Sequence, residues 1–270
     1  MSKYTVCGYD MDILHDRMLQ IATEVDRICR EQGFKCSLYG GSVIGAVRHN
    51  GFIPWDHDID MAMPRKDYDK FVKYMLKNPN EKIFFSNFHS EKRYPNNWGK
   101  VRLNGTVFLE QELAPLTELH KGVFIDLHPI DNVIPCLLKP QVRLSQYFSC
   151  IGQVKSGVYQ GGRGLKYKVY KLFSWLPYWA INGLRDGAMK LFKHLPTKYV
   201  FKVAHPNDPK IEPMARDTFE DLIEHDFEDR RFFIPKHYHR FLRKRYGDYM
   251  QLPPESEIYE CCQTIVECKL

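Results

Sequence analysis

The stretch from Leu38 to Met63, LYGGSVIGAVRHNGFIPWDHDIDMAM, constrains the fold of this chain more than any other. A strand-like segment leads into the turn Gly40-Gly41-Ser42, and a second predicted strand carries Asp58-Ile59-Asp60. Residues two apart in a strand point to the same face, so Asp58 and Asp60 should project side by side while Ile59 faces the core. Two adjacent carboxylates repel each other unless a cation holds them, and Mg²⁺ prefers such oxygen ligands.

The glycine turn complements the acidic strand. At Gly40 and Gly41 the backbone N–H groups can approach a ligand closely, and the helix start at Ser42 favours an anion. With Arg48 between the two motifs, turn and acids together predict a site for a metal-bound nucleotide phosphate. Each motif alone has an ordinary explanation, because such a turn often only reverses the chain and such an acid pair often ends a solvated strand.

A third acid lies in the segment 122–131, GVFIDLHPID, which is interpreted as a buried strand. Asp126 stands there among apolar residues, where a carboxylate is costly unless it has a partner. A metal held by Asp58 and Asp60 would be that partner; the alternative is an exposed strand end. His128 is interpreted as an ordinary packed histidine.

Two basic residues lie on one face of another predicted strand. Strands are predicted at 82–88, 99–103 and 106–110, and the second carries Lys100 and Arg102. These cations either balance the charge of a diphosphate or form an exposed basic strand edge. Apolar residues at helical spacing predict amphipathic helices at 12–32 and 65–76, and a further helix is predicted at 236–245.

Composition predicts a globular cytosolic protein. The chain has 270 residues, 44% of them hydrophobic and 14% aromatic, which is ample for a packed core. Its opening is polar, and no stretch reaches the roughly 18 uncharged apolar residues of a spanning helix, so we expect neither a secretory signal nor a membrane anchor. The eight cysteines are expected to be reduced thiols, most of them buried. A zinc site at Cys261, Cys262 and Cys268 is an open alternative.

Positive charge is concentrated in one segment. Residues 139–202 carry twelve lysines and arginines against one acid, Asp186, in a chain of net charge +6. Lysines alternate here with aromatic residues such as Trp175 and Trp179 at helical spacing, a pattern that suits an anionic membrane surface. One alternative is a helical insertion that packs on the sheet and exposes a solvated basic face. Nucleic acid is not expected as a partner, because no recognised nucleic-acid module accompanies the charge.

The chain resembles the LicD family of the nucleotidyltransferase-fold superfamily in three runs: GGSVIGAVRHNGFIPWDHDIDMAMPR, GVFIDLHPID and IPKHYHRFLRKRYGDYMQLPPE. The match spans most of the chain in the family's order. It implies an α/β fold with a mixed sheet flanked by helices. The expected organisation is one catalytic domain with a nucleotidyltransferase-like core at 1–138, a basic helical insertion at 139–205 and a C-terminal part at 206–270. Where the family often reads PWDDDID, this chain has His57, which is expected to point away from Asp58 and Asp60.

The resemblance also implies a chemistry. Asp58, Asp60 and Asp126 match the superfamily's three acidic metal ligands, which would hold one or two Mg²⁺ or Mn²⁺ ions. Similar members transfer phosphocholine from CDP-choline to a sugar hydroxyl of teichoic-acid or other surface-glycan precursors and release CMP, and relatives transfer ribitol phosphate. Asp126 is expected to orient or deprotonate the acceptor hydroxyl. The residues expected to bind phosphate are Gly40, Gly41, Ser42, Arg48, Lys100 and Arg102.

A choline headgroup would need an aromatic cage, because a quaternary ammonium binds ring faces, and Trp55 and Trp98 are the candidate walls. Two other functions stay open at this point. The same metal site would serve a nucleotidyltransferase that attacks an NTP and releases pyrophosphate, and a third hypothesis is a non-catalytic module bound to membrane glycan. The three intact acids argue against that third hypothesis. We expect a cytoplasmic protein at the inner face of the membrane, in contact with anionic lipid through 139–202.

Overall fold

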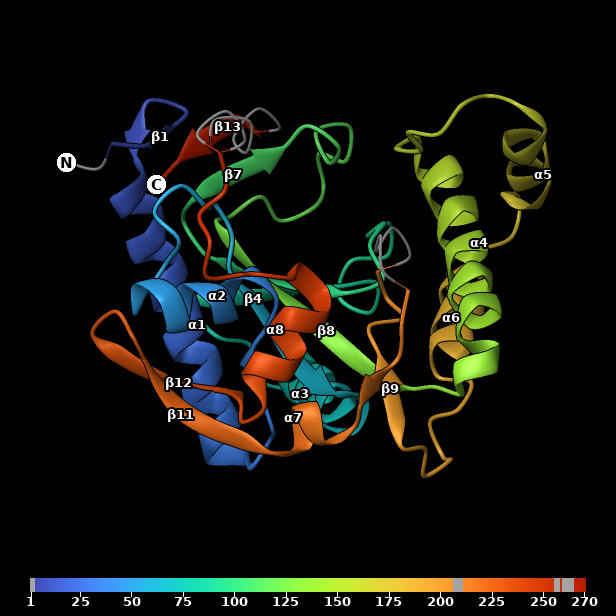
Figure 1. The fold of residues 1–270 in the computed structure, drawn as a ribbon. Helices are drawn as coiled ribbons and strands as arrows, with labels where there is room; N and C mark the ends of the chain where they lie inside the picture. Colours follow the sequence, from blue (N-terminus) through green and yellow to red (C-terminus); the bar gives the residue numbers. More distant parts are fainter. Residues whose placement is uncertain (1–2, 206–210, 255–257, 259–264) are drawn as a thin grey trace.

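The computed structural model describes residues 3–205, 211–254, 258 and 265–270. Within these residues the centre of the fold is a mixed sheet of seven strands, flanked by helices (Figure 1). Its strand path is β10-β9-β8-β4-β3, and β6 pairs with β8 and with β5. The strands are β3 (Ser37–Leu38), β4 (Asp60–Pro64), β5 (Ile83–Ser86), β6 (Gly99–Leu103), β8 (Phe124–Asn132), β9 (Tyr199–Phe201) and β10 (Met214–Ala215). The predicted α/β class, with a mixed sheet flanked by helices, is confirmed.

Strand β8 is the centre of this sheet because three strands pair with it. It runs parallel to β4, with Asp60 opposite Asp126, and antiparallel to β6, with Lys100 opposite Asp126. One row of residues across three adjacent strands therefore contains Lys100, Asp126 and Asp60. On either side of Asp126 along β8, the apolar side chains of Ile125 and Leu127 are fully buried, which fixes the register of the strand.

Helices cover the sheet where the sequence is amphipathic. Helix α1 (Met11–Gln32) begins at Asp10, whose carboxylate accepts a hydrogen bond from the Asp12 N–H at 3.0 Å, and it ends at Gly33 with φ of 66°. Helix α3 (Arg65–Lys77) follows β4 directly. Both predicted helices, at 12–32 and 65–76, are confirmed to within one residue. Their apolar faces join the strands in one hydrophobic core.

The predicted bounds agree best with the structure for β6, the strand that pairs with another strand on each of its edges. The strand at 99–103 is confirmed as β6, while those at 82–88 and 106–110 are shorter, as β5 and β7 (Val107–Glu110). The prediction of one strand through Asp58, Ile59 and Asp60 is wrong in part, since β4 begins only at Asp60. The preceding chain turns at Ile53, whose carbonyl accepts from the Asp56 N–H at 2.9 Å, and regular pairing starts after this turn.

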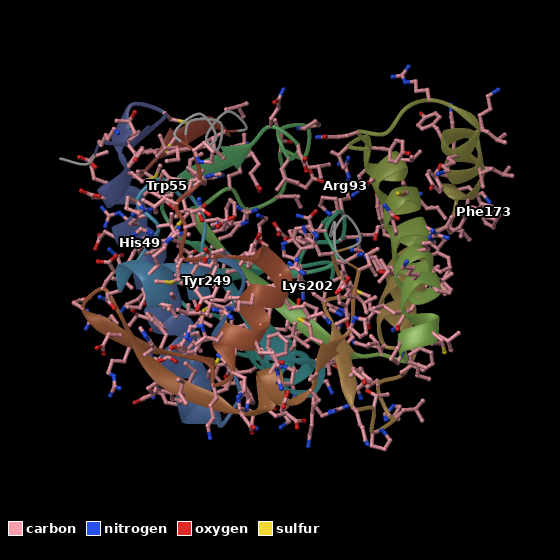
Figure 2. The ribbon with its side chains drawn as sticks, in the orientation of Figure 1. His49, Trp55, Arg93, Phe173, Lys202 and Tyr249 are labelled. Atoms are coloured by element: carbon pink, nitrogen blue, oxygen red, sulfur yellow. The ribbon has the colours of Figure 1, made fainter. Side chains whose placement is uncertain are left out.

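The basic segment forms a separate group of helices beside the sheet (Figure 1). They are α4 (Leu138–Ser156), preceded by a 3₁₀ turn at Pro135–Leu137, then α5 (Leu165–Phe173) and α6 (Tyr178–Met189). The buried Arg185 of α6 donates to the carbonyl oxygens of Tyr94 and Pro95, at 3.0 and 3.1 Å. Figure 2 labels Arg93, which donates to the Ser156 carbonyl at 3.2 Å. These contacts fix α4 and α6 to the core. The division of the chain at 138 and 205 stays a prediction.

Smaller elements complete the fold. Two hairpins are β1 (Thr5–Val6) with β2 (Tyr9–Asp10), and β11 (Leu222–Phe227) with β12 (Arg230–Pro235); β13 (Ile265–Lys269) pairs with β7. Helix α7 (Asp217–Glu220) precedes β11, and α8 (Tyr238–Tyr246) is the helix predicted at 236–245. None of the helices in the described ranges is long and apolar enough to cross a membrane.

The cysteines that the structure describes are free thiols, as expected. Only Cys29 and Cys36 among them are buried, so the expectation that most would be buried is wrong. Cys7 and Cys136 are exposed because they lie in a surface turn and in the 3₁₀ turn before α4. Two of the three candidate zinc ligands, Cys261 and Cys262, lie outside the described residues.

Candidate active site

Asp60 and Asp126 lie side by side because β4 and β8 are parallel and pair in register at these residues. His128 comes two residues after Asp126 on β8 and therefore projects from the same face. The Nε2 atom of His128 is 2.9 Å from Oδ1 of Asp60. The ligand atoms of all three side chains lie within 4.8 Å of one another. We call these three residues the β4–β8 cluster.

The protonation of the cluster follows from its surroundings. Burial acts to raise the pKa of Asp60, but the interaction with His128 and the charge of Lys202 hold that pKa at about 2. Burial and Lys202 lower the pKa of His128. At neutral pH we therefore infer a neutral imidazole whose Nε2–H donates to an ionised Asp60 carboxylate. In that tautomer Nδ1 of His128 has a free lone pair, and this buried atom has no hydrogen-bond partner among the residues that the structure describes.

Two further carboxyls lie next to the cluster. The charge of Asp56, then burial, raises the pKa of Asp58 well above its usual value, and Asp60 and Asp126 add to this effect. Burial and the charge of Asp60 raise the pKa of Asp56 to about 6, and a hydrogen bond with Asp58 partly offsets this rise. Asp58 thus contributes to the same negative region, although it lies outside the set of ligand atoms within 4.8 Å. Its role as a metal ligand stays a prediction.

Strand β6 brings a cation to the other side of Asp126. The Nζ atom of Lys100 lies 3.0 Å from Oδ1 of Asp126 and 3.2 Å from Oε1 of Glu110, and the lysine side chain is 3% exposed. Arg102, on the same face of β6, is also buried and donates to the Gly122 carbonyl oxygen at 3.0 Å. The alternative of an exposed basic strand edge is wrong, because β6 lies between β5 and β8. A phosphate-binding role stays a prediction for both residues.

The glycine turn lies against the acids. Gly40 has φ of 58°, and a Cβ atom at this position would meet Oδ2 of Asp60 at 3.0 Å and the Tyr246 hydroxyl at 3.3 Å. Gly41 then begins α2 (Gly41–Ile44), which continues as a π-helical turn, η1 (Gly45–His49). The Ser42 hydroxyl oxygen accepts a hydrogen bond from the Asp60 N–H at 2.8 Å. The turn and the start of β4 are therefore fixed to each other.

Arg48 connects this turn to the far end of the chain. Its Nη1 donates to the carbonyl oxygens of Tyr249 and Gln251, at 2.8 and 3.2 Å. Its Nε is 3.0 Å from Nε2 of His49. These contacts give Arg48 a structural partner in the segment after α8; binding of phosphate by this residue stays a prediction.

The two candidate tryptophans have different surroundings. Trp98 lies beside the cluster, with its ring centre 5.7 Å from that of His128 and 5.0 Å from that of His205. Trp55 lies against Tyr4 and His49, each with its ring centre 5.9 Å away. Figure 2 shows Trp55 and His49 on one side of the molecule and Lys202, which contacts the Tyr39 ring, near its centre. Of the two rings, Trp98 is the one that contacts the β4–β8 cluster.

The pKa of His57 depends on its burial and on the charged groups around Asp126. Burial lowers the pKa of His57, and the charges of Glu110, Lys100 and Asp126 also act on it. Its Nδ1 atom is buried, and no described residue forms a hydrogen bond with it. The expected orientation of His57, away from Asp58 and Asp60, stays a prediction.

Lowering the pH from about 7.5 to about 5.5 is expected to weaken Mn²⁺ binding roughly tenfold or more. Without metal, Asp56 has a pKa of about 6, so this carboxyl takes up a proton over this range, and the raised pKa of Asp58 acts in the same direction. A bound cation must displace those protons, and its affinity falls as the pH falls. Calorimetric titration at both pH values, repeated in buffers with different ionisation enthalpies, measures affinity and proton release together. An affinity independent of pH would contradict these protonation states.

Comparison with known proteins agrees with this geometry. Residues 33–129, which run from the end of α1 into β8, match the family model described as LicD/FKTN/FKRP, nucleotidyltransferase domain. The chain is 26% identical over 251 residues to the lipopolysaccharide cholinephosphotransferase LicD of Haemophilus influenzae, covering 88% of this chain and 91% of that protein. It is 25% identical over 144 residues to an uncharacterized protein of Rickettsia typhi, covering 43% of this chain and 44% of that protein.

The matched region contains the parts that build the site. It includes the glycine turn, Asp58, Asp60, Lys100, Asp126 and His128. The longer similarity, to the Haemophilus influenzae protein, also extends over most of the remaining chain. Together, the match to the family model and the similarity over most of the chain support the assignment of this chain to the LicD family.

Proposed function

We propose that this protein is a metal-dependent transferase that moves phosphocholine, or a similar phospho-alcohol group, from a CDP-activated donor to a sugar hydroxyl of a cell-surface glycan precursor. The observation that carries the proposal is the register of β4 and β8, which brings Asp60, Asp126 and His128 within 4.8 Å of one another. The similarity to a protein named as a lipopolysaccharide cholinephosphotransferase supports the choice of group and of acceptor class. Teichoic acid is a second acceptor of the same kind.

The donor atoms of the site fit a divalent cation. Two carboxylates and an imidazole converge, and the raised pKa of Asp58 reflects excess negative charge beside them. Carboxylate oxygens suit Mg²⁺ and Mn²⁺. We propose that Asp60 and Asp126, with Asp58, would hold one or two such ions, and that His128 orients the Asp60 carboxylate. A bound ion would neutralise charge on the donor diphosphate and on the departing nucleotide.

The chain's own residues would position the reactants. Asp126, oriented by Lys100 at 3.0 Å, would accept the proton of the attacking sugar hydroxyl. The sugar oxygen bonds to the phosphorus of the phosphocholine group as the bond from that phosphorus to the bridging oxygen breaks, and CMP leaves with that oxygen. The backbone N–H groups at Gly41 and Ser42, with Lys100, are the proposed contacts of the diphosphate. Arg48 and Arg102 are secondary candidates, because both already bond to backbone carbonyls.

Trp98 is the proposed wall for the choline headgroup, because its ring lies 5.7 Å from that of His128. Trp55 is a weaker candidate, because it contacts Tyr4 and His49 instead. We place the reaction at the cytoplasmic face of the membrane. There the lysines of 139–202 would meet anionic headgroups near a lipid-linked acceptor.

A binding and turnover experiment tests the reaction class. We expect Mg²⁺-dependent heat on titration with CDP-choline, abolished by EDTA, and CMP release when an acceptor glycan is added. CDP-ribitol and CTP serve as comparison ligands. Release of pyrophosphate from CTP would replace the proposal with nucleotidyl transfer. Glycan binding without any nucleotide binding would replace it with a non-catalytic module.

A further inference from the structure

The outer helix of the basic segment presents large apolar side chains to solvent. No residue of α5 is buried, and Leu165 and Leu172 are 78% and 67% exposed. They are seven residues apart and so lie on one side of the helix. Trp175 and Trp179, in and just after the connection to α6, are 74% and 77% exposed. We call Leu165, Leu172, Trp175 and Trp179 the α5 apolar strip.

The opposite side of α5 is held in place, so the orientation of this strip is fixed. The Tyr170 ring centre lies 5.4 Å from that of Tyr147 on α4 and 5.7 Å from that of Tyr159. The ammonium group of Lys155 donates to the Ser174 carbonyl at 2.8 Å and ties the α5–α6 connection to α4. Figure 1 shows α5 on the side of α4 away from the sheet, and Figure 2 labels Phe173 at this outer edge.

Positive charge surrounds the strip. Arg163, Lys166, Lys168 and Lys171 are all exposed, and the sequence from 139 to 185 contains neither aspartate nor glutamate. Lys168 lies between Leu165 and Leu172 on the same side of the helix. Apolar and indole side chains bordered by lysines are the pattern of a helix that lies in the interface of an anionic bilayer. A nucleic acid would use the lysines and tryptophans but would leave the two leucines in water.

We propose that α5 and its connection to α6 dock on the surface of a bilayer containing anionic lipids, with the α5 apolar strip in the interface and the neighbouring lysines on the headgroups. This inference rests on the membrane contact proposed above for 139–202, and not on the transfer reaction. It assigns the contact to one helix and one connection. It also gives the contact two parts, an electrostatic one and an apolar one, that substitutions can separate.

Co-sedimentation with vesicles tests the inference without any nucleotide. The full chain is mixed with phosphatidylcholine vesicles, with and without phosphatidylglycerol, at low and high salt. We expect binding only to the anionic vesicles, and weaker binding at high salt. The variant Lys166→Gln/Lys168→Gln/Lys171→Gln is expected to lose roughly a hundredfold in partition coefficient, from about fivefold for each lysine. Its matched control is Lys66→Gln/Lys73→Gln/Lys77→Gln, which removes three exposed lysines from α3 and should bind like the wild type.

A second pair of variants tests the apolar part. Trp175→Ala/Trp179→Ala should weaken binding while preserving its salt dependence, and Leu76→Ala, which truncates a side chain of α3 that is 47% exposed, is the control. Circular dichroism checks that each variant is folded. Equal binding to neutral vesicles, or unchanged binding of the α5 variants, would overturn the inference. Self-association that the α5 variants abolish, without vesicle binding, would reassign the strip to a second copy of the chain. Because CMP release is measured separately, failure here leaves the catalytic proposal untouched.

Discussion

Replacing Asp60 with asparagine is expected to lower turnover roughly a thousandfold or more while the fold stays intact. In the wild type, Nε2 of His128 is 2.9 Å from Oδ1 of Asp60. Asparagine keeps the size of the side chain and an oxygen that can accept this hydrogen bond. It removes the charge of the carboxyl whose pKa is held at about 2, and so removes a negative charge that is present at neutral pH. The measurement is the rate of CMP release at saturating CDP-choline and Mg²⁺, together with far-UV circular dichroism.

Two comparisons make the Asp60 result specific. Asp229→Asn removes an exposed acid from the turn between β11 and β12 and should keep wild-type turnover. Asp126→Asn should be as inactive as Asp60→Asn and should also leave Lys100 without its 3.0 Å partner. Turnover near that of the wild type in folded Asp60→Asn protein would remove the proposed metal site. Loss of structure in that variant would move the test to Mn²⁺ titration of Asp58→Asn.

Replacing Asp131 with asparagine is expected to lower the free energy of unfolding by about 3–5 kcal/mol. Nε and Nη2 of Arg65 donate to the two carboxylate oxygens of Asp131 at 2.6 and 3.1 Å. The two side chains are 5% and 1% exposed, so the substitution leaves a buried guanidinium without its bidentate partner. Burial raises the pKa of Asp131 to about 6 in spite of Arg65, so the pair is ionised above that pH. Urea unfolding followed by circular dichroism at neutral pH measures the loss.

The control for Asp131 is an ion pair with an exposed lysine on α3, the helix that carries Arg65. Asp67 lies 3.2 Å from Lys70, whose side chain is 48% exposed, so Asp67→Asn should cost less than about 1 kcal/mol. Replacing both buried partners, in Arg65→Met/Asp131→Leu, should recover most of the stability, because no unpaired charge remains. A cost for Asp131→Asn no larger than that for Asp67→Asn would show that this buried pair contributes little.

Local sequence patterns predicted the parts of the site that depend on alternation along one strand. A carboxylate among apolar residues marked Asp126 as a buried acid that needs a partner, and the bounds of β6 came directly from its β-rich run. The adjacency of β4 and β8 is a long-range pairing that no local pattern contains. It was inferred only indirectly, from the need of Asp126 for a partner and from the resemblance to a family. For the same reason, the alternative that Lys100 lies on an exposed strand edge was wrong. A local residue pattern does not distinguish an edge strand from an interior one.

Two residues of the site were missed although a signal was present. His128 lies two residues after Asp126 in one strand, so the period-two argument that paired Asp58 with Asp60 also places the imidazole beside the carboxylate. Asp56 appeared only as part of a motif, yet its charge is the main reason for the raised pKa of Asp58. The hydrogen bonds from Arg48 to the carbonyls of Tyr249 and Gln251 join residues about 200 positions apart, so no pattern of neighbouring residues predicts them.

The hydrogen bonds from Arg48 to Tyr249 and Gln251 affect the order in which the protein assembles during translation. The glycine turn and Arg48 are translated early. Their partners are translated about 200 residues later: Tyr246, whose hydroxyl lies beside Gly40, and the two carbonyls that accept hydrogen bonds from Arg48. Contacts of such sequence separation form late, since the loop they close is long. On the ribosome, the sheet with its acids is therefore expected to assemble before α8 and the segment after it pack against the glycine turn. A nascent chain halted before residue 246 would carry the proposed metal ligands without a finished site, and the proposed activity would begin only once α8 has been released.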